Sequence, residues 1–236
     1  SMAPNGDYFI TSQRHYEDAT ANQAQYVTEL KDEKNNTLYR FESAQPSNIT
    51  WSPDSKSLVY LLNGELKRLN LKTMQLSVIA KNLSGANSFQ FFDNNSLIFS
   101  WSKSPTDNGK LTKHYQGLQD RWSYARTTSQ VYLLDIPTGL SKILSQGPLS
   151  HSLEDFDAKS GRVLMSRSAQ AMQLSPQPAT ELVELNLATS ALTVLGQYNT
   201  FNQAKYTDDG IYVTAGPDFN NGLGRNLPKG MLANNY

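Results

Sequence analysis

The residues best suited to bind another molecule lie together in one polar and aromatic stretch, residues 103–129. Six candidate contacts for a substrate or partner stand out there: His114, Tyr115, Arg121, Trp122, Tyr124 and Arg126. Recognition surfaces favour aromatic and arginine side chains in combination, and a guanidinium can hold a carboxylate through two parallel hydrogen bonds. The same composition suits a local hairpin that packs its own aromatic rings, so both interpretations stay open.

A pair of carboxylates near the start of the chain, Glu17 and Asp18, is the second candidate binding site. Two such groups can hold the charged amino terminus of a peptide through charge-assisted hydrogen bonds. Solvated loop charge is the favoured alternative. Together with His15 they form a weak candidate for metal ligation, which no second cluster of ligands supports. No metal ion or cofactor is therefore predicted.

No catalytic residue is predicted in this chain. Serines are abundant and histidines stand at His15, His114 and His151, but a nucleophilic site needs a serine beside a histidine that a carboxylate orients. The chain contains no G-x-S-x-G segment, which is the pattern that carries the nucleophile of α/β-hydrolases. It also lacks cysteine, which excludes disulfides, a thiolate nucleophile and a cysteine-based metal site.

The charge and hydropathy of the chain limit its partners. Its net charge is zero and only 18% of its residues are charged, whereas a groove for nucleic acid needs a basic stripe. No apolar run approaches the roughly 20 residues that cross a bilayer, so no membrane span is predicted. The composition suits either the cytoplasm or an exported compartment, and an exported location is slightly favoured.

A short sequence motif, called the phrase below, occurs five times and determines where these residues lie in the fold. Each copy is an apolar strand end, a tight polar turn and an apolar strand, with turns at Gly6, Ser55, Asn95, Gly161 and Gly210. Such turn residues supply the positive φ angles and side-chain bonds that hairpins require. The turns are 49, 40, 66 and 49 residues apart, and repeats of about 40–50 residues are typical of β-propeller blades.

The clearest copy runs from Ile49 through Trp51-Ser52-Pro53-Asp54 to Ile79 and contains four short strands. The sequence therefore predicts an all-β protein, a β-propeller with about four four-stranded blades and a partial fifth, within a ring of roughly seven or eight blades. The expected blades are 1–46, 47–85, 86–148, 149–198 and the partial 199–236, with an insertion at 103–129. A β-sandwich is the alternative fold.

Aromatic residues on the expected strands are interpreted as packing between sheets, because they occur at alternating positions. They are Trp51, Tyr60, Phe91, Phe99 and Trp101. The first blade nearly lacks its first strand, since its first turn lies at Gly6. An incomplete ring leaves open sheet edges, and open edges predict self-association or marginal stability.

The phrase Trp51-Ser52-Pro53-Asp54, followed by Leu58-Val59-Tyr60, resembles the propeller repeats of the prolyl oligopeptidase family of serine peptidases. This family includes dipeptidyl peptidase IV-like and acylaminoacyl peptidase-like members. The opening Met2–Ile10 and the stretch Val131–Gly139 are similar to other repeats of that family, so the resemblance covers essentially the whole chain. TolB-like periplasmic propellers share the same phrase and are the second resemblance.

The resemblance implies the non-catalytic part of such a peptidase. That part is a propeller that covers the active site of a separate α/β-hydrolase domain and admits only short peptides. In the dipeptidyl peptidases a glutamate pair holds the substrate's amino terminus, but the segment around Glu17 and Asp18 matches that pattern poorly. The expected partners are accordingly the hydrolase domain of the parent protein and short peptides.

Two other functions stay open at this point. A TolB-like propeller would serve as a scaffold for protein interactions. A propeller hydrolase or lyase acting on carbohydrate would need carboxylates that converge on one site, and the candidates are Glu154, Asp155 and Asp157 on the first strand of the fourth repeat.

Overall fold

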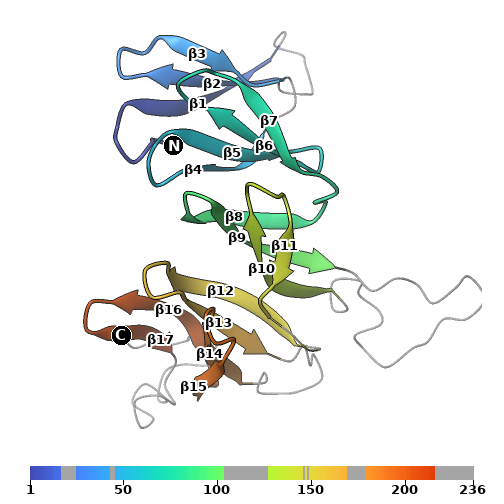
Figure 1. Cartoon of the computed structure of the whole chain (residues 1–236), viewed down its shortest axis with the longest axis vertical. Coiled ribbons are helices and arrows are strands. Elements are labelled where there is room, and N and C mark those ends of the chain that lie inside the picture. The colour runs from blue at the N-terminus through green and yellow to red at the C-terminus, as the bar shows by residue number, and fades with distance from the viewer. Residues whose placement is uncertain are drawn as a thin grey trace, which may run out of the picture. The chain divides into compact units, whose positions relative to one another are not determined.

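The computed structural model describes residues 1–16, 25–42, 46–103, 127–145, 147, 149–168 and 179–215. Every regular element in these ranges is a β-strand, and the strands form five antiparallel sheets (Figure 1). In each sheet the strands follow one another in chain order, so each sheet is a meander. The prediction of an all-β fold is confirmed. All eight candidate contacts, Glu17, Asp18 and the six within 103–129, lie outside the described residues.

Three sheets have four strands each, one has three and one has two. The first sheet contains β1 (Tyr8–His15), β2 (Gln25–Asp32) and β3 (Thr37–Arg40). The second contains β4 (Ser47–Trp51), β5 (Ser57–Leu62), β6 (Glu65–Asn70) and β7 (Leu76–Ala80). The third contains β8 (Ala86–Asp93), β9 (Ser96–Lys103), β10 (Thr128–Asp135) and β11 (Ser141–Ile143).

The last two sheets complete the described part of the chain. The fourth contains β12 (Ser150–Asp157), β13 (Arg162–Ser168), β14 (Thr180–Asn186) and β15 (Leu192–Tyr198). The fifth is the hairpin of β16 (Phe201–Thr207) and β17 (Gly210–Ala215). None of the described residues belongs to a helix that is long and apolar enough to cross a membrane.

The second strand of each four-stranded sheet carries the core. In β5 the run Ser57–Leu62 is buried at every position, and Leu58, Val59 and Tyr60 are fully buried. A strand with both faces covered needs such a continuous apolar run, whereas the last strands alternate weakly and stay largely exposed, as β15 does. Burial therefore decreases from the second strand of a sheet to its last strand.

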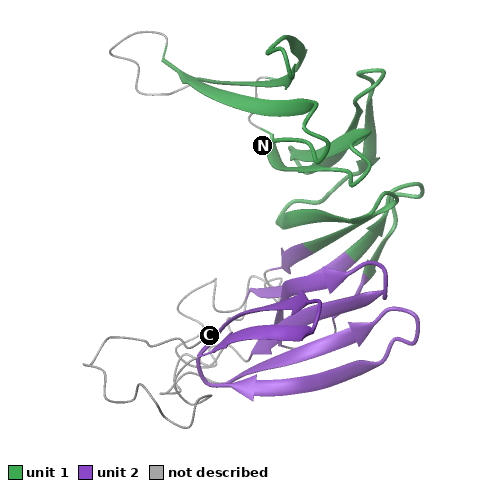
Figure 2. Cartoon of the chain, turned by 90° about the vertical axis from the view of Figure 1, so that its left-hand side faces the viewer, with its two compact units in different colours: residues 1–99, 133–142 green, residues 100–132, 143–236 purple. Residues whose placement is uncertain are grey.

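Sheets pack face to face within each of two compact units, which Figure 2 shows in green and purple. The first unit comprises residues 1–99 and 133–142, and the second comprises residues 100–132 and 143–236. In the first unit, Ile10 and Leu30 of the first sheet pack against Leu58 and Tyr60 of the second. In the second unit, Leu164 of the fourth sheet packs against the fifth sheet. Consecutive sheets stacked in this way form the propeller-type layers that the repeat predicted.

The first sheet has three strands, and the sequence predicted that the first blade nearly lacks its first strand. Only Ser1 and Met2 precede its first turn in the position of a first strand, and Met2 forms an isolated bridge to Phe9. Its turn otherwise repeats that of the second sheet. The Ala3 N–H donates to Tyr8 O at 2.9 Å and the Gly6 N–H to Ala3 O at 3.0 Å.

Candidate functional site

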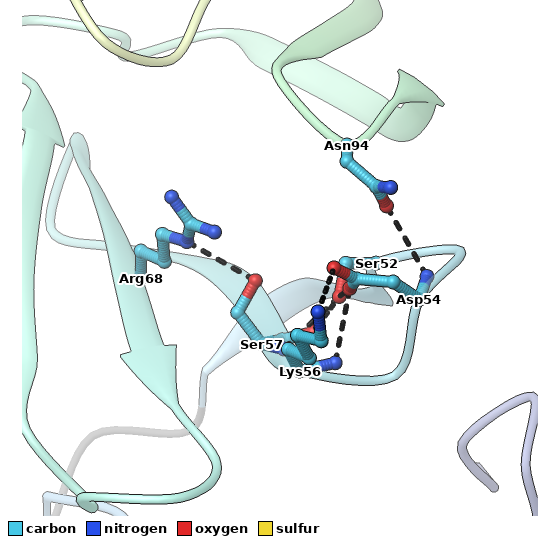
Figure 3. A network of polar contacts seen from close by, with 6 residues as sticks. All are labelled: Ser52, Asp54, Lys56, Ser57, Arg68 and Asn94. Atoms are coloured by element: carbon cyan, nitrogen blue, oxygen red, sulfur yellow. Dashed lines mark hydrogen bonds and ion pairs between the residues drawn. The ribbon is translucent and has the colours of Figure 1, made fainter.

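The repeated phrase Ser52-Pro53-Asp54 builds a turn whose polar groups bond to one another (Figure 3). The Ser52 hydroxyl lies 2.7 Å from Asp54 Oδ1 and 2.9 Å from Ser57 O, and it accepts the Ser57 N–H at 3.0 Å. Asp54 Oδ1 also accepts the Lys56 N–H at 3.0 Å. The hydrogen bond from Ser52 is the main cause that lowers the pKa of the Asp54 carboxyl. The phrase therefore encodes a rigid turn.

The same turn connects the first three sheets. The Asn5 N–H of the first sheet donates to Ser55 Oγ at 3.1 Å, and the Asp54 N–H donates to Asn94 Oδ1 of the third sheet at 3.2 Å (Figure 3). Ser55 has a φ of 56°, which turns its side chain into this position. These bonds are structural, because each group of the phrase is used within the turn or by a neighbouring turn.

We expect Ser52→Ala to lower the free energy of unfolding by about 2 kcal/mol. The substitution leaves the buried N–H of Ser57 without its acceptor, and an unsatisfied buried donor costs about 1–3 kcal/mol. Urea denaturation followed by tryptophan fluorescence measures the loss. The matched control is Ser77→Ala, which removes an exposed hydroxyl and should change little. Equal losses in the two variants would show that the Ser52 bonds do not stabilise the turn.

The described edge of the 103–129 insertion is a small aromatic and cationic cluster. Trp101 on β9 and Tyr132 on β10 have ring centroids 5.5 Å apart. Lys103 Nζ lies 4.2 Å from the Trp101 centroid and 5.7 Å from that of Tyr132, within the range of cation–π attraction. This cluster lies on β9 and β10, the two strands that the insertion joins. The six candidate contacts inside the insertion remain predictions.

The acidic pair Glu154 and Asp155, candidates for carbohydrate chemistry, joins the fourth sheet to the fifth. The register of β12 on β13 shifts between Leu153 and Asp155, so Glu154 is the extra residue of a β-bulge, which re-aims side chains. Asp155 Oδ2 accepts the Tyr206 N–H at 2.8 Å, and Glu154 Oε2 accepts the Ala204 N–H at 3.4 Å. Burial raises the pKa of the Glu154 carboxyl. Both carboxylates are therefore engaged by backbone groups of β16.

A matching contact joins the second sheet to the third. The register of β4 shifts between Ser47 and Thr50, and Asn48 has a φ of 53°. Asn48 Oδ1 accepts the Ser88 N–H of β8 at 2.9 Å. In both places an irregular first strand turns a side-chain acceptor toward the first strand of the next sheet. The edge N–H groups of these first strands are satisfied in this way rather than by another strand.

A cavity of about 520 Å³ lies in the second unit, between the fourth and fifth sheets. Its charged lining residues are Asp157, Arg162, Glu184, Asp208 and Asp209. The β12–β13 turn, β14 and the β16–β17 hairpin supply them. The lining therefore contains four acidic residues and one arginine, a balance of charge that favours a positively charged group over an anion.

The polar groups inside the cavity are suited to binding rather than to acid–base chemistry. The Tyr206 hydroxyl donates to Glu184 Oε2 at 2.9 Å, and Arg162 lies 3.8 Å from Glu184 Oε1. Burial raises the pKa of Tyr206, and the hydrogen bond to Glu184 raises it further. The phenol therefore keeps its proton at neutral pH and acts as a donor. This cavity could not be predicted from the sequence, because it depends on contacts such as that between Glu184 and Tyr206, which are 22 residues apart.

The two described histidines, His15 and His151, lie in different environments. In the described ranges neither ring is hydrogen-bonded to a serine hydroxyl, and no group of three or more His, Asp or Glu residues converges to hold a metal ion. His15 is exposed at the end of β1, whereas His151 is buried on β12 with Nδ1 3.0 Å from Leu149 O. Nδ1 therefore carries the ring proton.

His151 makes the stability of the second unit depend on pH. Burial lowers its pKa, and the charge of Arg167 on β13 lowers it further, while the bond to Leu149 opposes both. The unfolded chain then binds a proton more readily than the folded chain, so stability is full above a pH of about 6.5 and falls below it. We therefore expect the second unit to be less stable at pH 5 than at pH 7.

The variant His151→Asn tests this expectation, because an amide can still donate to Leu149 O but does not titrate. Its unfolding free energy, measured by urea denaturation at several pH values, should vary less between pH 7 and pH 5 than that of the wild type. The control His15→Asn removes an exposed histidine and should keep the wild-type slope. An unchanged slope in His151→Asn would assign the pH dependence to other groups.

Neither a protein-family model nor any curated protein matches this sequence. Solved structures do match it. A protein assigned as a dipeptidyl aminopeptidase IV from Bacteroides ovatus aligns with 92% of this chain at a TM-score of 0.60 and 12% identity. An acylaminoacyl peptidase from Pyrococcus horikoshii aligns with 89% at a TM-score of 0.58 and 11% identity. A protein assigned as TolB from Agrobacterium tumefaciens aligns with 90% at a TM-score of 0.51 and 9% identity.

These matches define the class of fold. The chain is a β-propeller of the kind found in dipeptidyl peptidases, acylaminoacyl peptidases and TolB, and both resemblances read from the sequence are confirmed at the level of structure. The chain spans 36% of the dipeptidyl aminopeptidase, 41% of the acylaminoacyl peptidase and 71% of the TolB protein. At such low identities the likeness establishes the fold alone.

Proposed function

We propose that this chain is the non-catalytic propeller region of a serine peptidase of the prolyl oligopeptidase family. The observation that carries the proposal is the pair of matches to peptidases, which have TM-scores of 0.60 and 0.58 and align with most of this chain but only 36% and 41% of the peptidase chains. Its role is to control the access of short peptides to a separate α/β-hydrolase domain. The chain has no G-x-S-x-G segment, which agrees with a serine nucleophile in a separate hydrolase domain.

Within this proposal each sheet is one blade. The blades are 1–46, 47–85, 86–148, 149–198 and the partial 199–236, in a ring of roughly seven or eight blades. The insertion at 103–129 leaves the third sheet beside the cluster of Trp101, Lys103 and Tyr132. Its arginine and aromatic side chains are the proposed contacts with a peptide or with the hydrolase domain.

The proposal is tested on the native protein that carries this sequence, isolated from its source. We expect an intact mass well above the 26.3 kDa of this chain, labelling by a fluorophosphonate that reacts with activated serines, and a labelled peptide that maps outside these 236 residues. The isolated chain is the control and should stay unlabelled. A native mass near that of the chain without labelling, or a labelled serine within it, would contradict the proposal.

The TolB-like scaffold is the second candidate, and one observation favours it. The chain spans 71% of the TolB protein, a much larger share than it spans of either peptidase. This candidate expects no fluorophosphonate labelling of the native protein and a stable complex with a protein partner. The labelling experiment therefore separates the two functions.

A further inference from the structure

The turn between β5 and β6 consists of only two residues, Asn63 and Gly64. Leu62 and Glu65 pair directly across it, and the turn residues have φ angles of 52° and 76°. These angles define a type I′ turn, the usual conformation of an Asn-Gly hairpin. Within the described part of the chain, the Asn63 carbonyl, its exposed side-chain amide and the Gly64 N–H have no hydrogen-bond partner.

The peptide unit between Asn63 and Gly64 can therefore rotate without breaking a hydrogen bond. This rotation converts the type I′ turn into type II′, which keeps the positive φ of the first residue and changes its ψ to about −120°. At that ψ the Gly64 nitrogen lies on the same side of the Cα–C bond as the Asn63 Cβ. The nitrogen then faces the Asn63 Cγ across a five-membered ring, and glycine has no Cβ to hinder the approach.

We propose that Asn63 is a site of spontaneous backbone modification, and that its product loosens the link from the second sheet to the third. Hydroxide removes the Gly64 amide proton, and the nitrogen attacks the Asn63 Cγ. The N–Cγ bond forms, the Cγ–Nδ2 bond breaks, and Nδ2 takes a proton from water and leaves as ammonia. Water then opens the succinimide ring at either carbonyl, so residue 63 becomes an aspartate or an isoaspartate.

The other described Asn-Gly pair, Asn5-Gly6, is held in place and supplies the contrast. The Gly6 N–H donates to Ala3 O at 3.0 Å, so its nitrogen is engaged in the turn. The Asn5 amide donates to Asp7 Oδ2 at 2.6 Å, and its oxygen accepts the Asp7 N–H at 3.2 Å. Ring closure at Asn5 must break these hydrogen bonds, whereas ring closure at Asn63 breaks none of this kind.

An isoaspartate at position 63 lengthens the turn by one methylene group, because the backbone then continues through Cβ and Cγ. The turn is attached to the segment between β7 and β8. Gly64 O accepts the Leu83 N–H at 2.9 Å, and a Cβ on Gly64 would lie 3.0 Å from Ser84 Oγ. A longer turn displaces the Gly64 carbonyl, so the modification releases the Leu83 N–H just before the third sheet begins.

The test incubates the folded chain at neutral and at mildly alkaline pH and follows each Asn-Gly peptide by chromatography and mass spectrometry. We expect isoaspartate to form about tenfold faster at Asn63 than at Asn5, because breaking the hydrogen bonds of Asn5 and Gly6 raises the barrier there. Both rates should rise with pH, since the attacking nitrogen must lose its proton. The pairs at Asn108 and Asn221 lie outside the described residues and are measured separately.

The chain unfolded in urea is the control for local sequence, and there Asn63 and Asn5 should react at similar rates. Equal rates in the folded chain would overturn the proposal. So would a reaction at Asn63 that occurs only in urea, because the folded turn would then prevent the rotation. Aspartate formed without isoaspartate would also overturn it, since direct hydrolysis of the amide needs no ring.

Amide hydrogen exchange at Leu83, read by NMR, tests the proposed release. We expect this amide to exchange about fivefold faster once Asn63 has become isoaspartate, because it loses its hydrogen bond to Gly64. The matched variant Asn63→Gly suits the same type of turn but carries no amide, so its Leu83 exchange should stay constant during the incubation. Exchange at Leu83 that is the same before and after the reaction would overturn the release.

Discussion

Replacing Gly139 with alanine should lower the free energy of unfolding by about 3 kcal/mol. Gly139 ends the turn between β10 and β11 with a φ of 69°, a conformation that costs a residue with a Cβ about 1–2 kcal/mol. A Cβ there would lie 2.4 Å from the carbonyl oxygen of Ile79 on β7. That oxygen belongs to backbone, so the neighbouring sheet must shift to accommodate the methyl group, and this shift adds to the cost.

Gly6→Ala separates the two costs. Gly6 has a similar φ of 82°, but a Cβ would meet nothing within 4 Å. This control should lose only about 1 kcal/mol, the cost of the backbone conformation alone. Urea denaturation of both variants measures the difference, which is the free energy of the close approach between the β10–β11 turn and β7. Similar losses in the two variants would mean that β7 yields at little cost.

The repeated turns and the strands could be predicted from the sequence because both are encoded locally. Of the five predicted turn positions, Gly6, Ser55, Gly161 and Gly210 have positive φ, whereas Asn95 does not. Glycine and small polar residues suit the positive φ of those four turns. The apolar runs between them became the buried second strands, such as β5. The turn residues and the period of the apolar pattern were sufficient for the fold.

Three of the five strand aromatics are buried in the core, as the alternation of the strands predicted. Tyr60 and Phe99 are fully buried, and Phe91 is nearly so. Trp51 and Trp101 are only partly buried. The Trp51 Nε1–H donates to Ser1 Oγ at 2.7 Å, and the ring of Trp101 contacts the Lys103 ammonium. Alternation places a residue on a face of the sheet, but it does not tell how fully the next sheet covers that face.

The contacts between sheets could not be predicted, because they depend on irregular residues within strands. The sequence alone suggested a strand on which the Glu154 carboxylate is free. Only the bulge in β12 reveals that this carboxylate is directed to β16. The cavity lined by Arg162, Glu184 and Tyr206 likewise needs three segments to meet. No sequence pattern within one repeat marks the extra residue of a bulge or the place where distant segments come together.

Asp155 should therefore contribute more to stability than any other acidic residue of the fourth sheet. Its carboxylate accepts the N–H groups of Tyr206 at 2.8 Å and Phe156 at 2.9 Å, and hydrogen bonds to charged groups contribute about 1.5–3 kcal/mol each. We expect Asp155→Ala to lower the free energy of unfolding by about 3 kcal/mol, because both donors lose their acceptor. Asp155→Asn keeps one oxygen and should lose about half as much.

The comparison variant Asp157→Ala removes a partly buried carboxylate that bonds to Ser160 and accepts the Lys159 N–H at 3.0 Å within the β12–β13 turn, and because these bonds are local to the turn, it should lower the urea midpoint less than Asp155→Ala. The comparison also addresses the carbohydrate hypothesis, which needs a carboxylate free to act on a substrate. If Asp155 joins the fourth sheet to the fifth, its loss should expose β16 to amide exchange, and Asp155→Asn should reduce stability. A variant with full stability and unchanged exchange in β16 would instead leave the carboxylate available for chemistry.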